Sequence, residues 1–340
     1  MPDSFLKKLA DAQQIYSGFA ELSYHSHQRE LIYELDQIKL YHYQAKVKKP
    51  DAIPLLVVFA TVNRPEILDL LPDQSFLGGL LDNGADVYLI DWGYPDSDDN
   101  TLSMHDYISH YLHACVLFIK KHSHQKQINV LGICQGGLLC LCYTLMYKEV
   151  KNLILISTPI DFSTRDHVIA RVLKQIEIKK IIEQSGNIAG AWLTQFFISL
   201  RPFELIGKKY LNFVDQLQNT SFIDSFLRVE KWLHDAPDQA GTAFGELLTL
   251  FYQQNKLIKN ELMLGGKKID LAQLNVPILN IMAREDQITP MSASKVLKQY
   301  VGSNDYTQAI FDSGHIGIYI SKKVLARMPR MIAEWLRERS

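Results

Sequence analysis

Cysteine is scarce in this chain of 340 residues, which contains only Cys115, Cys134, Cys140 and Cys142. No two of them have the C-x-x-C spacing of zinc or redox sites, and no histidine–cysteine cluster has zinc-finger spacing. The phosphate-binding pattern G-x-x-x-x-G-K-[ST] is also missing, which argues against a nucleoside triphosphatase. We therefore expect no metal site and no bound cofactor. Three of the four cysteines fall in apolar helical stretches, where we expect small buried hydrophobic side chains, and Cys134 is the exception.

Long apolar runs and an excess of charge of one sign are missing as well. No apolar run approaches the ~20 residues that span a bilayer, and residues 1–25 lack the apolar core of a signal peptide. The formal net charge of −1 gives no reason to expect a nucleic acid or an anionic membrane as a partner. With 47% apolar and 21% charged residues, the composition is that of a globular protein, which we expect to be cytoplasmic.

The chain does contain a regular alternation of strand-like and helical patterns. Residues 30–35 and 38–44 alternate apolar and polar side chains, which predicts an antiparallel hairpin. Strands buried on both faces are predicted at 54–60, 85–93, 128–133, 152–158 and 276–283, with a last strand in 306–315. Helical periodicity separates them at 67–83, 104–122, 137–148 and 321–337. This order predicts an α/β fold with a mostly parallel central sheet that is covered on both faces.

The alternation stops between about Pro159 and Leu274, where the pattern is largely helical and aromatic residues are scattered. The simplest interpretation is a helical cap, residues 159–274, inserted into a core formed by residues 29–158 and 275–340. Residues 1–28 then form a separate N-terminal segment. The alternative is a helical extension without a gating role. We favour the cap because sites in open α/β sheets lie at the carboxyl ends of the strands.

One short motif, Gly132-Ile133-Cys134-Gln135-Gly136, points to covalent chemistry. It lies between a predicted strand and a predicted helix, the layout of the nucleophile elbow of α/β-hydrolases, with cysteine in place of the usual serine. Such a tight turn strains the backbone at the nucleophile and requires small neighbours, which the two glycines supply. The turn also places Cys134 at a helix N-terminus, where the macrodipole favours a thiolate.

A catalytic acid and a histidine should follow the nucleophile, each in a loop after a strand. Asp286 follows the strand predicted at 276–283, and His315 follows the last strand. We expect His315 to act as the general base and Asp286 to orient its ring. Asp286 could instead cap the helix that begins near Pro290, and His315 could be structural. Glu285 and Asp312 are the rival acids.

The oxyanion hole of this fold combines two backbone amides. One is the N–H of the residue after the nucleophile, here Gln135. The other comes from the loop after the strand predicted at 54–60, where we expect Val62, with Thr61 or Asn63 as alternatives.

Several segments together resemble the catalytic subunit of polyhydroxyalkanoate synthases, most closely the short class III type that works with a second subunit. They are LGICQGG, PLLVVFATVNRPEILDL, VYLIDWGYPD, FLRVEKWLHDAPDQAG, FYQQNKLI and FDSGHIGIYIS, in matching order from about residue 30 onward. The IDWGYPD and EKWLHDAPDQAG motifs have no general explanation in the hydrolase fold, which makes the resemblance specific. One departure is Gln287, where the family often has histidine after the acid.

The resemblance implies an α/β-hydrolase fold with a cap and a catalytic subunit that forms homodimers. It also implies polymerisation of (R)-3-hydroxyacyl-CoA, usually the C4 member, into a polyester with release of CoA. The family's nucleophile, acid and base fall on Cys134, Asp286 and His315, and its oxyanion amides on Val62 and Gln135. Product accumulation would bring the enzyme to the surface of polyester granules. A cysteine-dependent thioesterase or another acyltransferase of the same fold stays open as an alternative, as does a non-catalytic granule protein.

Overall fold

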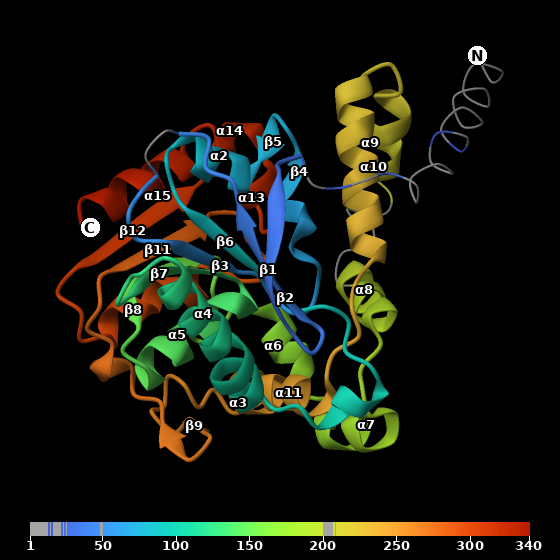
Figure 1. Cartoon of the computed structure of the whole chain (residues 1–340). Coiled ribbons are helices and arrows are strands. Elements are labelled where there is room, and N and C mark those ends of the chain that lie inside the picture. The colour runs from blue at the N-terminus through green and yellow to red at the C-terminus, as the bar shows by residue number, and fades with distance from the viewer. Residues whose placement is uncertain are drawn as a thin grey trace.

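The chain is an α/β protein built on one eight-stranded sheet, as a computed structural model shows (Figure 1). The structure describes residues 26–47, 50–199 and 209–340, together with residues 13, 15, 22, 24 and 207. Most of the predicted N-terminal segment, residues 1–28, lies outside them. In spatial order the strands are β1 (Arg29–Leu35), β2 (Ile38–Tyr43), β6 (Val87–Asp91), β3 (Leu55–Val58), β7 (Ile128–Ile133), β8 (Val150–Ile156), β11 (Ile278–Ala283) and β12 (Tyr306–Phe311).

The sheet is parallel from β6 to β12, and only β2 runs against its neighbours. The antiparallel β1–β2 hairpin turns at Asp36, whose φ of 52° lies in the left-handed region. The predicted hairpin and the mostly parallel sheet are therefore confirmed. The carboxyl ends of the central strands β3, β7, β8, β11 and β12 lie along one edge of the sheet, where the predicted site residues follow them.

Helices cover both faces of the sheet and fill the segment between β8 and β11. They are α2 (Phe76–Asp82), α3 (Met104–Asp106), α4 (His113–His122), α5 (Gln135–Met146), α6 (Val168–Leu173), α7 (Ile178–Ser185), α8 (Gly190–Ser199), α9 (Lys209–Asp215), α10 (Thr220–His234), α11 (Gly241–Glu246), α12 (Met291–Lys295), α13 (Gly317–Ile320), α14 (Lys322–Leu325) and α15 (Met328–Arg337). A π-helical turn joins α3 to α4, so the helix predicted at 104–122 is continuous. No helix among the described residues is long and apolar enough to cross a membrane.

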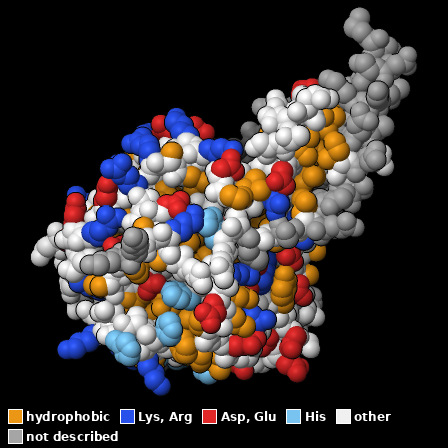
Figure 2. Space-filling model, turned by 45° about the horizontal axis from the view of Figure 1, so that its top comes forward, with side chains coloured by type: hydrophobic (Ala, Val, Ile, Leu, Met, Phe, Trp, Pro, Cys, Tyr) orange, Lys and Arg blue, Asp and Glu red, His pale blue; other side chains and the backbone are white. Residues whose placement is uncertain are grey.

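The alternating side chains of the strands feed two hydrophobic cores, one on each face of the sheet. One core packs β-strand side chains such as Leu56 and Val130 against α4, α5 and α11. The other packs Val57 and Leu131 against α2, α13 and α15. Burial on both faces explains why these strands are continuously apolar. Basic and acidic side chains both occur on the face shown in Figure 2, in keeping with the near-zero net charge.

The helical pattern predicted at 67–83 is helix only in its second half. The first half forms a 3-10 turn (Pro65–Leu68) and the short strands β4 (Asp69–Leu71) and β5 (Gln74–Ser75). The helix α2 begins where the Ser75 hydroxyl accepts a hydrogen bond from the Gly78 N–H at 2.7 Å, because this N-cap satisfies a free amide. The buried Asp69 carboxylate accepts a bond from the same hydroxyl and holds the turn.

The segment between β8 and β11 is mainly helical, with one short hairpin of β9 (Met263–Leu264) and β10 (Lys267–Lys268). Its first part, up to Leu193, and its later part, from Ala240 onward, both join the same hydrophobic core as α4 and α5. The helices α9 and α10 instead form a small core of their own around Phe213 and Phe226. The division of the chain into core and cap at residues 159–274 stays a prediction.

Candidate active site

The turn after β7 has the geometry of a nucleophile elbow. Cys134 has φ 53° and ψ −120°, a strained conformation for a residue with a Cβ, and α5 begins at the next residue. A Cβ on Gly132 would overlap Gly137, and a Cβ on Gly136 would overlap the carbonyl oxygens of Val58 and Phe59. The glycines therefore let the turn approach the neighbouring strand closely. Cys134 is half-buried, whereas the other three cysteines are fully buried and burial raises their thiol pKa values.

The structure brings the predicted acid and histidine into contact. Asp286 follows β11 and His315 follows β12, and His315 Nδ1 lies 2.7 Å from Asp286 Oδ2. The other carboxylate oxygen, Oδ1, accepts hydrogen bonds from the backbone N–H groups of Ile288 at 3.0 Å and Thr289 at 2.8 Å. Asp286 does not cap the helix near Pro290, because α12 has Pro290 at its N-cap and no side-chain cap hydrogen bond. One oxygen instead fixes the turn before that helix, and the other holds the imidazole.

The rival acids lie elsewhere. The Asp312 carboxylate is exposed and pairs with the Arg284 guanidinium at 2.6 Å. Glu285 and Gln287, on either side of Asp286, are exposed, although both border the cavity described below. Asp286 is 5% exposed and is the carboxylate that faces His315.

The pKa of His315 is set by its burial and by its two neighbours, Asp286 and Cys134. Burial acts to lower the pKa of His315, but the Asp286 carboxylate and the Cys134 thiol together raise it well above its usual value. With Nδ1 bonded to Asp286, the other ring nitrogen, Nε2, is the one available to the thiol of Cys134. A raised pKa favours the imidazolium, which can stabilise a thiolate at position 134. Tyr319 packs against the His315 ring edge to face, with ring centres 6.5 Å apart.

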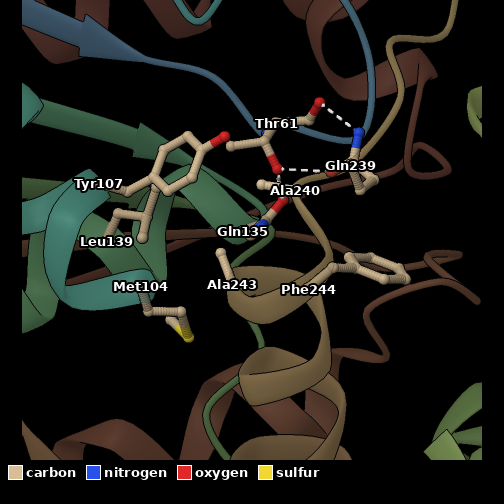
Figure 3. Close-up of a pocket in the computed structure, with 9 residues that line it drawn as sticks. All are labelled: Thr61, Met104, Tyr107, Gln135, Leu139, Gln239, Ala240, Ala243 and Phe244. Carbon is tan, nitrogen blue, oxygen red and sulfur yellow. Dashed lines mark hydrogen bonds between the residues drawn. The ribbon is translucent and has the colours of Figure 1, made fainter. Parts of the chain in front are cut away.

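The loop after β3, residues 59–64, is here called the oxyanion loop. Thr61 is excluded as an oxyanion donor, because its N–H donates to Gln135 Oε1 at 3.1 Å (Figure 3). The N–H of Val62 has no acceptor among the described residues, and Val62 and Gln135 both border the cavity that Cys134 lines. This arrangement suits the two predicted oxyanion donors.

Cys134 and His315 line a cavity of about 420 Å³. Its wall is mostly apolar and comes largely from the segment between β8 and β11, including Ile169, Leu193, Phe197, Leu248 and Tyr252. A cavity of this size holds a small organic ligand. The apolar wall around the thiol and imidazole disfavours water and strengthens the charge interactions at the site.

Two residues beside the site, Gln239 and Trp232, were not predicted individually. Gln239 contacts Thr61, and Trp232 lines the cavity while its indole N–H donates to the backbone oxygen of Arg64. Both fall in the EKWLHDAPDQAG motif, so the only signal in the sequence was that this motif lacked an explanation from the fold.

Comparison with known proteins agrees with this geometry. The family model of the α/β hydrolase fold matches residues 69–321, more than half of the chain. A soluble variant of monoglyceride lipase from Saccharomyces cerevisiae is similar in structure, with TM-score 0.56 and 13% identity over 94% of this chain and 97% of that one. Epoxide hydrolase A from Mycobacterium thermoresistibile also has TM-score 0.56, with 14% identity over 92% and 98% of the two chains. These likenesses establish the fold.

Curated relatives carry a narrower description, "poly(3-hydroxyalkanoate) polymerase subunit PhaC". The relative from Allochromatium vinosum is 40% identical over 98% of this chain and 93% of its own length. Those from Thiocystis violacea and Synechocystis are 43% and 42% identical, each over 92% of this chain and over 88% and 84% of their own lengths. The family resemblance inferred from the sequence is confirmed. The chain belongs to the poly(3-hydroxyalkanoate) polymerases, acyltransferases built on the α/β-hydrolase fold.

Proposed function

We propose that the chain polymerises (R)-3-hydroxyacyl-CoA, with 3-hydroxybutyryl-CoA as its usual substrate, through an acyl thioester on Cys134. The observation that carries the proposal is a cysteine in a strained elbow, beside an Asp286–His315 pair, at the wall of an apolar cavity. The polymerase relatives supply the reaction class.

In the first step the Cys134 thiolate attacks the thioester carbonyl of the substrate. The oxyanion that develops accepts hydrogen bonds from the N–H groups of Val62 and Gln135. The carbon–sulfur bond to CoA breaks, and the His315 imidazolium gives its proton to the departing CoA thiolate. One thioester replaces another, so the enzyme-bound acyl group stays activated at little free-energy cost.

In the second step a 3-hydroxyl group attacks the acyl group on Cys134. The now neutral His315 accepts the hydroxyl proton, an ester bond forms, and the Cys134 thiolate is regenerated beside the imidazolium. An ester on serine would have lost most of this driving force before elongation. This explains the preference for a thiol at the elbow.

Water competes with the hydroxyl group for the acyl enzyme. The apolar wall of the cavity disfavours water, which directs the acyl group to the growing chain. The proposed polymerase therefore depends on the helices between β8 and β11 as well as on the triad.

The same family assignment supports three further proposals. The chain works with a second synthase subunit, as the word "subunit" in its relatives' names indicates. It forms a homodimer, and it gathers at the surface of polyester granules as product accumulates.

The test is incubation of the purified chain with (R)-3-hydroxybutyryl-CoA, with and without a candidate second subunit, while CoA release and products are followed. Insoluble polyester together with CoA supports the proposal. CoA with free 3-hydroxybutyrate as the sole product would assign a cysteine-dependent thioesterase instead.

A further inference from the structure

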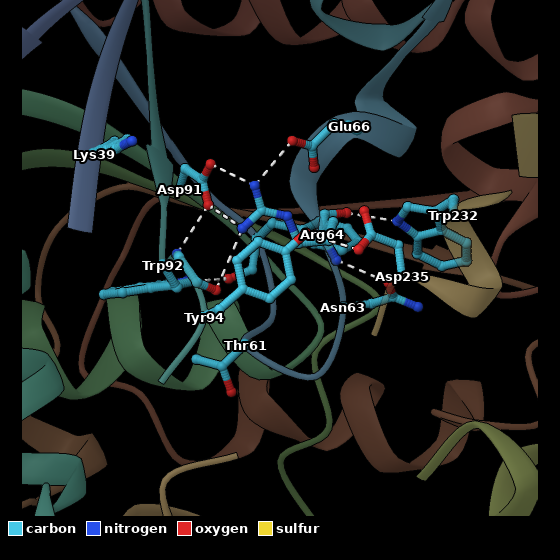
Figure 4. Close-up of polar contacts among 12 residues, drawn as sticks. Lys39, Thr61, Asn63, Arg64, Glu66, Asp91, Trp92, Tyr94, Trp232 and Asp235 are labelled. Atoms are coloured by element: carbon cyan, nitrogen blue, oxygen red, sulfur yellow. Dashed lines mark hydrogen bonds and ion pairs between the residues drawn. The ribbon is translucent and has the colours of Figure 1, made fainter. Parts of the chain in front are cut away.

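The oxyanion loop is held by side chains from distant parts of the chain. Three of its backbone carbonyl oxygens accept hydrogen bonds from such side chains (Figures 3 and 4). The donors are Trp92 Nε1 to Phe59 O at 2.9 Å, Gln239 Nε2 to Thr61 O at 3.0 Å and Trp232 Nε1 to Arg64 O at 2.6 Å. Trp92 belongs to the IDWGYPD motif, and Trp232 and Gln239 belong to the EKWLHDAPDQAG motif. Both motifs that the hydrolase fold does not explain therefore donate hydrogen bonds to the same loop.

The contact from Gln239 has a particular consequence for Val62. The carbonyl of Thr61 and the N–H of Val62 belong to one peptide group, which is planar and trans. In a trans peptide the C=O and N–H point in opposite directions, so fixing the oxygen also fixes the direction of the N–H. A hydrogen bond to the oxygen further polarises the group and strengthens its N–H as a donor.

Gln239 is itself well anchored. Its backbone pairs with Ile188 through two hydrogen bonds, of 3.0 and 2.8 Å, and its side chain is 3% exposed. Its Nε2 also donates to Pro237 O at 2.9 Å, and its Oε1 lies 2.8 Å from the Thr61 hydroxyl. The amide therefore has one orientation that satisfies both of its ends, and that orientation points Nε2 at Thr61 O.

The far end of the oxyanion loop is fixed by a buried ion pair. The Arg64 guanidinium bonds both oxygens of Asp91, at 2.6 and 2.7 Å, and Glu66 at 3.1 Å. Tyr94 stacks on the guanidinium at 4.5 Å, and its hydroxyl donates to Asp235, just after α10. Figure 4 shows Asp91 and Tyr94 reaching Arg64 from the end of β6, and Trp232 reaching it from α10. The loop is thus fixed at both ends around Val62.

We infer that Gln239 is a positioning residue for the oxyanion hole, which acts by setting the direction and strength of the Val62 N–H through the shared peptide group. Gln239 also pairs with Ile188, which lines the cavity. The packing of the helical segment between β8 and β11 is therefore coupled to stabilisation of the oxyanion. The inference rests on the proposed acyl transfer to Cys134.

The test compares two replacements of Gln239 by the rate of CoA release in a single turnover. Gln239→Met removes the donor without adding charge, and we expect acylation to slow about tenfold. Gln239→Glu places a carboxylate oxygen against Thr61 O, and we expect a loss of about a hundredfold, toward the cost of losing an oxyanion donor. The loss should appear in kcat with little change in KM, because the oxyanion exists only in the transition state.

The pH dependence of the acylation rate distinguishes positioning of the Val62 N–H by Gln239 from a general loss of packing in the variants. As the pH falls, protonation of the introduced carboxyl in Gln239→Glu restores a donor to Thr61 O. The rate relative to the unmodified chain should therefore recover toward acid pH in this variant and stay flat in Gln239→Met. Circular dichroism and thermal unfolding identify the pH range in which each variant is folded.

Gln253→Glu is the matched control. Gln253 Nε2 also donates to two backbone oxygens of the helical segment, those of Leu173 and Ile176, each at 2.8 Å, but it does not touch the oxyanion loop. We expect its kcat to stay within about twofold of the unmodified chain. Equal losses in Gln253→Glu and Gln239→Glu, or no loss in either folded Gln239 variant, would overturn the inference. Failure of the unmodified chain to acylate Cys134 would instead overturn the proposed function.

Discussion

The nucleophile elbow and the oxyanion loop are neighbours supported in different ways. They follow β7 and β3, which pair directly in the parallel sheet. The elbow depends on its own residues, because its glycines let Cys134 adopt a strained backbone against the next strand. The oxyanion loop contains no glycine and depends on side chains from the residue after β6, from α10 and from the segment before α11. One half of the proposed catalytic apparatus is therefore local and the other half is assembled by the whole fold.

The largest expected effect comes from breaking the local half. Gly136→Ala adds a Cβ that overlaps backbone oxygens of β3 and the residue after it, which cannot move aside as a side chain could. We expect more than a hundredfold loss of CoA release and a fall of about 1–3 kcal/mol in the free energy of unfolding. Urea denaturation and a CoA assay measure both. Gly245→Ala, where the new Cβ meets only the Ile182 side chain at 3.1 Å, should retain activity.

Asp286→Asn tests the chemistry that the elbow serves while leaving its geometry in place. Loss of the carboxylate removes a charge that raises the pKa of His315, so that pKa should fall. We expect acylation to fall by about a hundredfold to ten-thousandfold. The alkaline limb of the pH–rate profile, where the imidazolium loses its proton, should move to lower pH. An unchanged profile would mean that Asp286 does not act through His315.

Asp91→Asn removes the ion pair with Arg64 that fixes the far end of the oxyanion loop. The buried Arg64 guanidinium would lose both of its bonds to Asp91 and keep only Glu66 as a counter-charge, which costs up to the ~3–5 kcal/mol of a broken buried pair. We expect a large drop in the free energy of unfolding and a smaller, roughly tenfold drop in kcat, because Gln239 still holds Thr61. The loss of activity should thus be smaller than the loss expected for Asp286→Asn. A stable but fully inactive Asp91→Asn chain would contradict the role given to the pair.

The smallest expected effect on acylation comes from removing one hydrogen bond to the oxyanion loop. Trp232→Phe removes the donor to Arg64 O and keeps an aromatic ring in the cavity wall. Trp335→Phe removes an indole hydrogen bond of similar kind, to the Thr307 hydroxyl at 3.1 Å, far from the oxyanion loop. Both should cost about 1 kcal/mol of stability. Only Trp232→Phe should slow acylation, by about three- to tenfold, and equal kinetics in the two variants would contradict the loop's dependence on α10.

This difference in support also decides what could be predicted from the sequence. The fold class, the hairpin and the buried strands follow from apolar periodicity, because each strand reports its own burial. The elbow was predictable for the same reason, since its requirements lie within residues 132–137. Asp286 and His315 were found by their order after strands, and the structure brings them into contact. Their catalytic roles stay predictions until the variants above are measured.

The side-chain hydrogen bonds that hold the oxyanion loop could not be predicted in the same way. Gln239 and Thr61 are 178 positions apart, and no local pattern reports a contact between them. The helix predicted at 67–83 was wrong in its first half for a similar reason, because Asp69 is held by Ser26 and Ser75 rather than by its neighbours in a helix. Contacts of this kind appear only when the fold is assembled.

The most direct test of the whole account is intact mass measurement of the chain after brief mixing with (R)-3-hydroxybutyryl-CoA. We expect an added 3-hydroxybutyryl group on Cys134, located by peptide mapping, that is absent in Cys134→Ala and accumulates more slowly in Gln239→Glu than in Gln253→Glu. An acyl group on another residue, or CoA release that persists in folded Cys134→Ala, would contradict it.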